Sequence, residues 1–187
     1  MTKYLFLWFL ERGFVQITQK TLVSLFLLGL AVPSYSWTRK NVQKIEKFYN
    51  SKLSPIIMIP GSSATENRFD GLVTKLNQDR QGSKHSLLKV KVWNDGTITY
   101  SGSIDVKDNE PIIVIGFENN KDGYSNIKKQ AKMVNQAFEA LQSKYNFNNF
   151  KGLGHSNGGL IYTAFIENYL GDYDVDLRTL MTIGTPY

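Results

Sequence analysis

The sequence predicts an α/β protein with a mainly parallel sheet, flanking helices and one β-hairpin. Two apolar runs, residues 55–60 and 111–117, have the continuous hydrophobicity of strands that are buried on both faces. Residues 125–145 carry apolar side chains at helical spacing, with lysines on the opposite side. A third apolar run at 150–154 passes directly into a glycine-rich turn and a helical pattern. Strands that alternate with helices favour a parallel sheet, with the loops that follow the strands at one edge.

The remaining elements are assigned in the same way. Residues 87–93 alternate apolar residues with lysine, and the turn Asn94-Asp95-Gly96 leads to a second strand at 97–100, which predicts a half-exposed hairpin. A last strand is expected at 178–183. After the strand at 55–60 we expect a helix capped by Thr65 or Asn67, with Phe69, Leu72, Val73 and Leu76 on one face.

Composition excludes several classes of function. The 187 residues include no cysteine, which excludes disulfides, thiol catalysis and thiolate metal sites. The net charge of +6 comes from many separated lysines and not from a basic block, so we expect no nucleic-acid partner. The acidic residues at 105–110 match no metal-binding loop and are best explained as a solvated turn. We therefore expect neither a metal nor a cofactor.

Residues 1–36 have the features of a targeting segment. Lys20 precedes an apolar run at 22–32, and Ser34 and Ser36 place small residues at the two positions that a signal peptidase inspects. A secretory signal cleaved after Ser36 is the first interpretation, and an uncleaved membrane anchor or a buried core helix are the alternatives. This predicts export to the cell surface or the medium, with membrane or cell-wall association through the N-terminal segment. Residues 37–54 are predicted to be a spacer or a short amphipathic helix, and the folded domain would span 55–187.

The segment 150–160 has the pattern of a nucleophile elbow. Its Gly-x-Ser-x-Gly motif stands between an apolar strand and an amphipathic helix, with Ser156 at the bend. Gly154 and Gly158 would relieve crowding around a serine that is held in a strained backbone conformation. The amide of Asn157, first in the following helix, would point to the place where an oxyanion forms. A plain turn between a strand and a helix is the alternative.

The loop at 61–64 is the second candidate component of a catalytic site. It joins a buried strand to a helix and consists of Gly-Ser-Ser-Ala. Enzymes with an elbow of this kind take their second oxyanion donor from such a loop, and Ser62 is the candidate for that amide. A loop that only turns the chain is the alternative.

With these motifs in place, the chain resembles the α/β-hydrolase superfamily. More narrowly, it is similar to uncharacterised secreted cell-surface hydrolases of Gram-positive bacteria that are related to lipases. The resemblance covers roughly residues 55–187 and is carried by four segments, 55–69, 116–120, 150–162 and 182–187. It implies a serine, acid and histidine triad in that chain order, with Ser156 as the nucleophile and the amides of Ser62 and Asn157 as oxyanion donors. The implied substrate is a small-molecule or lipid ester.

Two departures qualify this expectation. Pro60 stands where many relatives have histidine, which affects the support of the oxyanion loop but not its backbone donor. No histidine follows Ser156, although the family takes its acid and its histidine from later segments, so the resemblance implies a domain that lacks its C-terminal strands. His155 is adjacent to the nucleophile in the elbow, His85 lies before the hairpin, and neither occupies the position of the family's base.

Two hypotheses therefore stand side by side. The first is a serine hydrolase of acyl esters with impaired activity. The second is a non-catalytic product, either a truncated chain or a cell-surface binding module. The acidic residues at 172, 174 and 176 precede the last strand, too early for the acid of the family, and are read as a solvated loop.

Overall fold

The protein is described here by a computed structural model, in which residues 19–79, 81–82 and 84–187 are placed and side-chain burial is described from residue 29 onward. The first half of the predicted leader, residues 1–18, lies outside the described residues. Helix α2 (Gln19–Tyr49) runs without interruption through the predicted cleavage site and contains Pro33. The predicted spacer is thus helical as far as Tyr49. Among the helices that the structure describes, none combines the length and the hydropathy needed to cross a membrane.

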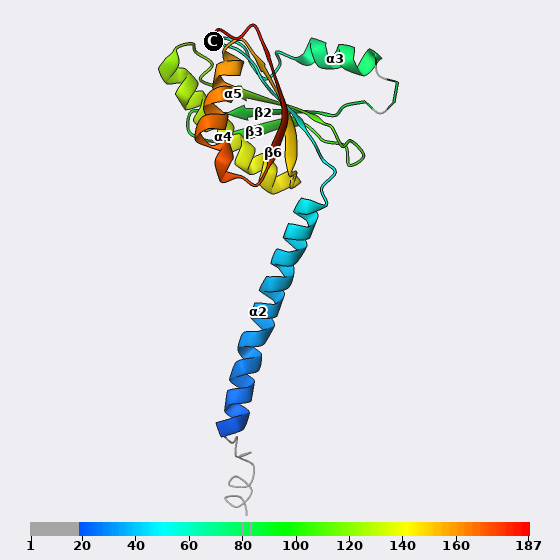
Figure 1. Ribbon diagram of the computed structural model, residues 1–187, viewed down its shortest axis with the longest axis vertical. Helices are drawn as coiled ribbons and strands as arrows, with labels where there is room; N and C mark the ends of the chain where they lie inside the picture. The colour runs from blue at the N-terminus through cyan, green and yellow to red at the C-terminus, as the bar shows by residue number, and fades with distance from the viewer. Residues whose placement is uncertain (1–18, 80, 83) are drawn as a thin grey trace, which may run out of the picture. The chain divides into compact units, whose positions relative to one another are not determined.

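The chain divides into two compact units, residues 1–46 and 47–187. The second unit is built on a six-stranded sheet with the order β3-β2-β4-β1-β5-β6 (Figure 1). Its strands are β1 (Ile56–Ile59), β2 (Leu87–Val92), β3 (Ile98–Gly102), β4 (Ile112–Phe117), β5 (Asn149–His155) and β6 (Asp176–Ile183). Every neighbouring pair is parallel except the β2-β3 hairpin. The predicted mainly parallel α/β sheet with one hairpin is confirmed.

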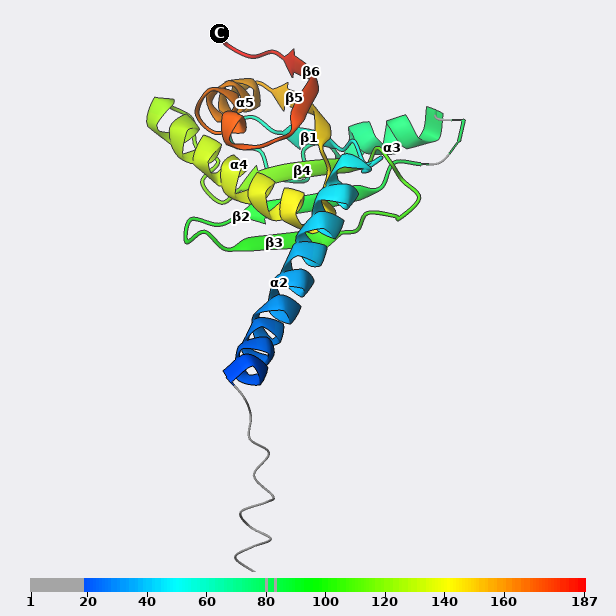
Figure 2. The ribbon, with the colours of Figure 1, turned by 60° about the horizontal axis from the view of Figure 1, so that its bottom comes forward.

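Helices cover the two faces of this sheet unequally. Helices α4 (Tyr124–Tyr145) and α5 (Asn157–Asn168), followed by the short helix η1 (Leu170–Asp172), lie on one face. Helix α3 (Asp70–Asp79) lies on the other, as Figures 1 and 2 show. The larger core cluster joins the sheet to α4 and α5, whereas α3 adds only Val73 to a smaller cluster, which also contains Phe69 just before the helix and residues of β1 and β4.

Phe138 of α4 is the centre of the larger core. Its ring makes edge or tilted contacts with the rings of Phe147, Phe150 and Phe165, at centroid distances of 5.5, 5.0 and 5.2 Å. Buried aromatic pairs of this geometry contribute roughly 0.5–1.5 kcal/mol each beyond the burial of their surface. Because Phe150 belongs to β5 and Phe165 to α5, this cluster fixes the strand and the helix on either side of the predicted elbow.

The expected cap of the helix after β1 is wrong. Neither Thr65 nor Asn67 caps the helix, which begins only at Asp70, because the Thr65 hydroxyl accepts a bond from the Asn67 amide in a preceding turn. Of the four apolar residues expected on one face, Phe69 and Val73 are buried, whereas Leu72 and Leu76 are 40% and 41% exposed. The ammonium group of Lys89 in β2 contacts the start of the helix, where it bonds the side chains of Asp70 and Asn67, each at 2.7 Å.

Parallel pairing brings four loops to one edge of the sheet. The loops that carry Ser62, Asp122, Ser156 and Thr185 follow the carboxyl ends of β1, β4, β5 and β6 respectively. His85 precedes β2 and therefore lies at the opposite edge. In parallel α/β sheets, ligands bind at the carboxyl edge, so the candidate site is sought there.

Candidate active site

The backbone at Ser156 has the strain expected of a nucleophile elbow. Its φ and ψ angles are 54° and −130°, in a region that residues other than glycine rarely adopt. The Ser156 amide donates to the carbonyl of Ile183 in β6 at 2.8 Å, and its own carbonyl accepts from Gly159 at 3.0 Å. The hydroxyl group does not cap the helix that follows. These bonds hold the bend from both sides and leave Oγ available for other contacts.

Glycines allow the bend to pack against its surroundings. A Cβ atom on Gly154 would lie 2.7 Å from Gly159 in the following helix, and one on Gly158 would lie 2.1 Å from the carbonyl oxygen of Ile59. Side chains at these positions are excluded by backbone, which cannot move aside as a side chain can. The predicted reason for the two motif glycines is therefore confirmed, with one addition. Gly158 is required by the approach of α5 to β1, and not only by the turn.

The loop after β1 lies directly against the serine. A Cβ atom on Gly61 would come within 2.7 Å of Ser156 Cβ and 3.3 Å of Ser156 Oγ. The next residues form a compact turn, in which the Ser63 amide donates to the Asn120 carbonyl at 2.8 Å and the Ala64 amide to the Gly61 carbonyl at 3.3 Å. Ser63 has a positive φ of 61° within this turn. The structure thus brings together the two loops that the sequence assigns to one site.

The backbone amides of Ser62 and Asn157 are the two predicted oxyanion donors. Among the described residues neither amide has an acceptor, whereas the neighbouring amides of Ser63 and Ala64 are both occupied. Asn157 is the first residue of α5, so its amide also carries the positive end of the helix dipole. Two unoccupied amides beside Ser156 are what an oxyanion hole requires. Their catalytic role stays a prediction.

The side chain of Asn157 connects the loops that follow three strands, β1, β4 and β5. It is 7% exposed, and its Nδ2 donates to Ser62 Oγ at 2.6 Å and to Asp122 Oδ1 at 2.5 Å. Asp122 also accepts from the amide of Gly123 through Oδ1, and its carbonyl accepts from Asn126. A buried amide with two short bonds holds the loop after β1 in a fixed position relative to the elbow. Asp122 was missed by sequence reasoning because its partner lies 35 residues away.

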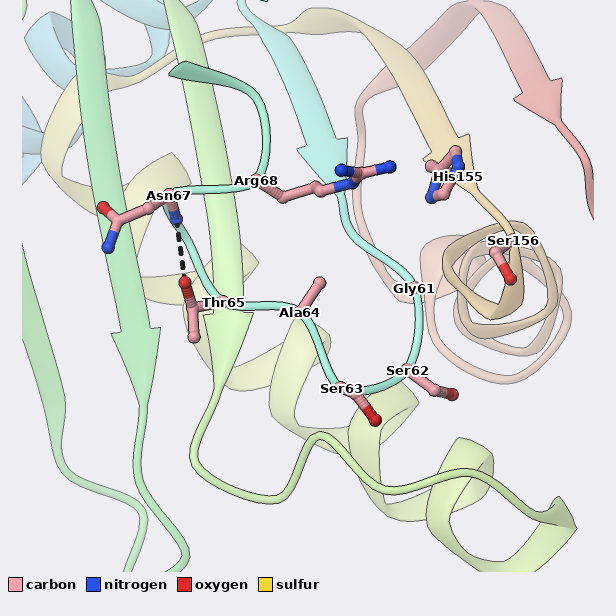
Figure 3. Close-up of a pocket in the computed structure, with 9 residues that line it drawn as sticks. All are labelled: Gly61, Ser62, Ser63, Ala64, Thr65, Asn67, Arg68, His155 and Ser156. Carbon is pink, nitrogen blue, oxygen red and sulfur yellow. Dashed lines mark hydrogen bonds between the residues drawn. The ribbon is translucent and has the colours of Figure 1, made fainter. Parts of the chain in front are cut away.

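A pocket of about 570 Å³ opens between these two loops (Figure 3). Its lining contains no apolar side chain larger than that of alanine, and Arg68 is its one permanently charged residue. In Figure 3 the side chains of Arg68 and His155 point toward one another, and the Ser156 hydroxyl is directed away from the His155 ring. The lining residues are Gly61, Ser62, Ser63, Ala64, Thr65, Asn67, Arg68, His155 and Ser156.

Neither histidine is placed to act as a base toward Ser156. The strand pairing places His85 seven residues away from Ser156 along the strand direction, toward the opposite edge of the sheet. At the usual rise per residue this offset is roughly 20 Å. Its backbone bonds the Asn77 side chain, and its Nδ1 lies 2.6 Å from the Glu110 carbonyl oxygen. His155 lines the pocket, but its ring faces Arg68, and its buried Nδ1 has no partner among the described residues.

The acidic residues near the last strand have structural contacts. Asp174 Oδ2 accepts from the Tyr49 hydroxyl at 2.9 Å, and this bond raises the pKa of Tyr49 above its ordinary value. Asp176 begins β6 at the edge opposite the pocket. Over the described part of the chain, no cluster of three or more histidine, cysteine or acidic side chains could hold a metal ion.

A buried tyrosine hydroxyl bonds helix α5 to strand β1. Tyr162 is fully buried, and its OH donates to the carbonyl of Ile57 in β1 at 3.0 Å. Burial raises the pKa of Tyr162 far above its usual range, so the group stays neutral and remains a donor. A Cβ atom on Gly152 would lie 2.8 Å from this ring, so the glycine makes room for the tyrosine. The helix that carries Asn157 is thereby fixed to the centre of the sheet.

We expect Gly158→Ala to lower the free energy of unfolding by at least about 2 kcal/mol, since the added methyl group collides with the carbonyl of Ile59. Gly71→Ala in α3 is the matched control, because nothing lies within 4 Å of a Cβ atom there. The control is expected to be neutral or to stabilise by up to about 1 kcal/mol. Urea unfolding followed by circular dichroism measures both. Equal stability of the two variants would contradict the close approach of α5 to β1.

Comparison with known proteins agrees with the fold. The family model described as an alpha/beta hydrolase of unknown function (DUF915) matches residues 43–187. Among solved structures, "the putative cell surface hydrolase from Lactobacillus plantarum WCFS1" is 57% identical, with a TM-score of 0.68, over 73% of this chain and 54% of that one. A lin2722 gene product from Listeria innocua is 35% identical, with a TM-score of 0.65, over 72% of this chain and 52% of that one.

The chain spans about half the length of these two solved structures. No curated protein is significantly similar to it. The family match covers far more than half of the chain, in agreement with the resemblance that the motifs indicate. The chain belongs to the alpha/beta-hydrolase family of unknown function (DUF915).

Proposed function

We propose that this chain carries the nucleophile and the oxyanion hole of a serine hydrolase that acts on acyl esters. The observation that carries the proposal is the strained backbone of Ser156, which lies beside two amides that have no acceptor in the described part of the chain. In the proposed site Ser156 is the nucleophile, and the amides of Ser62 and Asn157 are the oxyanion donors. No step requires a cofactor or a metal.

The chemistry follows from this arrangement. Ser156 Oγ attacks the ester carbonyl carbon, the carbonyl π bond breaks, and the resulting oxyanion accepts bonds from the two amides. The alcohol then leaves with the electrons of its C–O bond and takes up a proton. Water hydrolyses the acyl-serine through a second oxyanion of the same geometry. Each loss of an oxyanion-hole donor typically costs 10²–10³-fold in kcat.

The proposed weakness of the site is the transfer of the serine proton. A serine hydroxyl is a poor nucleophile at neutral pH unless a base accepts its proton. His85 lies at the other edge of the sheet, and the ring of His155 faces Arg68. In this chain the proton would therefore pass to hydroxide or to a buffer base, and turnover would be slow. The same observation favours the second candidate function, a non-catalytic module that keeps the elbow as a binding surface.

We expect a fluorophosphonate probe to label Ser156 slowly, and short-chain nitrophenyl esters to be hydrolysed below about 1 s⁻¹, the low end of ordinary enzymes. Residual catalysis of 10³–10⁴-fold over water is typical of serine enzymes that lack a triad member. Ser156→Ala should abolish labelling, whereas Ser101→Ala on the exposed strand β3 should leave it unchanged. Mass spectrometry of the labelled peptide identifies the site.

Two results would contradict this account. Rapid turnover that is lost in His85→Ala would mean that a histidine at the far edge of the sheet reaches the serine. Labelling that persists in Ser156→Ala would remove Ser156 from the role of nucleophile. Complete absence of labelling in a folded chain, judged by its circular dichroism spectrum, would favour the non-catalytic module.

We further propose that the protein acts at the cell surface. The support is the predicted export segment at 1–36 and the relative from Lactobacillus plantarum, which is named as a cell surface hydrolase. The N-terminal segment would provide the export signal or the attachment to membrane or cell wall.

We expect N-terminal sequencing of protein from the cell-wall fraction or the medium to begin near Trp37. Leu27→Arg, which places a charge in the apolar run, should block export, and Thr38→Arg beyond the predicted cleavage site should not. Intact protein found only in the cytoplasm would overturn the proposal, and intact protein in the membrane fraction would favour the uncleaved anchor.

A further inference from the structure

The wall of the pocket beside Ser156 is polar. Of the residues that line it, Ser62, Ser63, Thr65 and Asn67 carry uncharged polar side chains, and the remaining non-glycine residues are Ala64, Arg68, His155 and Ser156. A wall that binds an alkyl chain would need apolar side chains, because burial of apolar surface is the source of affinity for such a group. The residues of this chain therefore do not form the apolar wall that a long acyl group requires.

Arg68 gives this wall a positive charge. Its side chain extends toward His155 across the pocket (Figure 3). No carboxylate pairs with it in the described part of the chain. Of the nearest acids along the sequence, Asp70 pairs with Lys89 at 2.7 Å, and Oε2 of Glu66 is buried without a hydrogen-bond partner among the described residues. An unpaired guanidinium group beside a polar pocket attracts an anion and can bond it with two parallel N–H groups.

We propose that the pocket binds the anionic part of an ester, a carboxylate or phosphate group, at Arg68, while the ester carbonyl lies at Ser156. This inference rests on the proposed function for the position of the carbonyl, but the binding of the anion does not depend on catalysis. It deepens that function by naming the substrate class, which is a short ester that carries negative charge in its acyl part or in its alcohol part. The guanidinium group positions the ester and takes no part in bond making.

The first experiment measures binding without turnover. Ser156→Ala protein is titrated with two matched pairs of esters and followed by ligand-observed NMR. The acyl-side pair is monoethyl succinate and ethyl butyrate, and the alcohol-side pair is acetyl glycerol phosphate and glycerol monoacetate. We expect one anionic ester to bind about fivefold more tightly than its neutral partner, a modest factor because Arg68 is exposed to solvent. The pair that shows the preference identifies which part of the ester carries the charge.

Two arginine variants make the test specific. Arg68→Gln, in the Ser156→Ala background, should reduce the ratio of the two dissociation constants to about 1. Arg178→Gln removes the same charge from an exposed residue of β6 at the opposite edge of the sheet, and it should leave the ratio unchanged. Raising the ionic strength from about 0.05 to about 0.5 M should weaken the preference in the parent and not in Arg68→Gln.

The outcomes separate this inference from the proposed function. Equal binding of anionic and neutral esters by the Ser156→Ala protein would overturn the inference, even if the parent chain hydrolyses nitrophenyl esters. A preference that Arg178→Gln removes as fully as Arg68→Gln would also overturn it, since general attraction to a basic protein would then explain the binding. A preference that depends on Arg68, in a protein whose Ser156 reacts with no ester, would support the inference and refute the hydrolase.

Discussion

The geometry of the site depends on one constraint, the backbone of Ser156 at φ 54° and ψ −130°. A residue with a side chain costs of order 1–3 kcal/mol in such a conformation, and it persists only when its surroundings hold it there. Here the strand before the bend is paired on both sides, by β1 and by β6, and the bend itself is bonded to Ile183. The helix after the bend is fixed to β1 by Tyr162 and by the close approach of Gly158.

The packing that holds the bend at Ser156 also aligns the two proposed oxyanion donors. Fixing the start of α5 also fixes Asn157, whose side chain then bonds Ser62 and Asp122. Two loops that follow different strands are thereby held against the elbow by one buried amide. Preorganised donors of this kind stabilise a developing oxyanion without reorganising during the reaction. The donors lose their conformational freedom when the protein folds, and the packing of the core around Phe138 offsets that loss.

Much of this arrangement could be predicted from the sequence, because its signals are local. Apolar runs and helical spacing located the sheet and the long helix, and the Gly-x-Ser-x-Gly pattern located the bend. The contact between the loop of Ser62 and the elbow followed from parallel topology alone. The contact of Asp122 with Asn157 and the position of Arg68 beside His155 were not predicted, because both depend on the approach of loops that are distant in sequence. The cap of α3 was mispredicted because Thr65 and Asn67 form a turn of their own before the helix begins at Asp70.

The central proposal is that Ser156 is held in the geometry of a nucleophile and that neither His85 nor His155 accepts its proton. The most direct test is the pH dependence of the rate at which a fluorophosphonate modifies Ser156, with the background in Ser156→Ala subtracted. The account predicts a rate that rises about tenfold per pH unit from about pH 6 to pH 9, because hydroxide removes the proton. A rate that levels off above a midpoint near the ordinary imidazole pKa of about 6.5 would show that a histidine acts as the base, and would contradict the account.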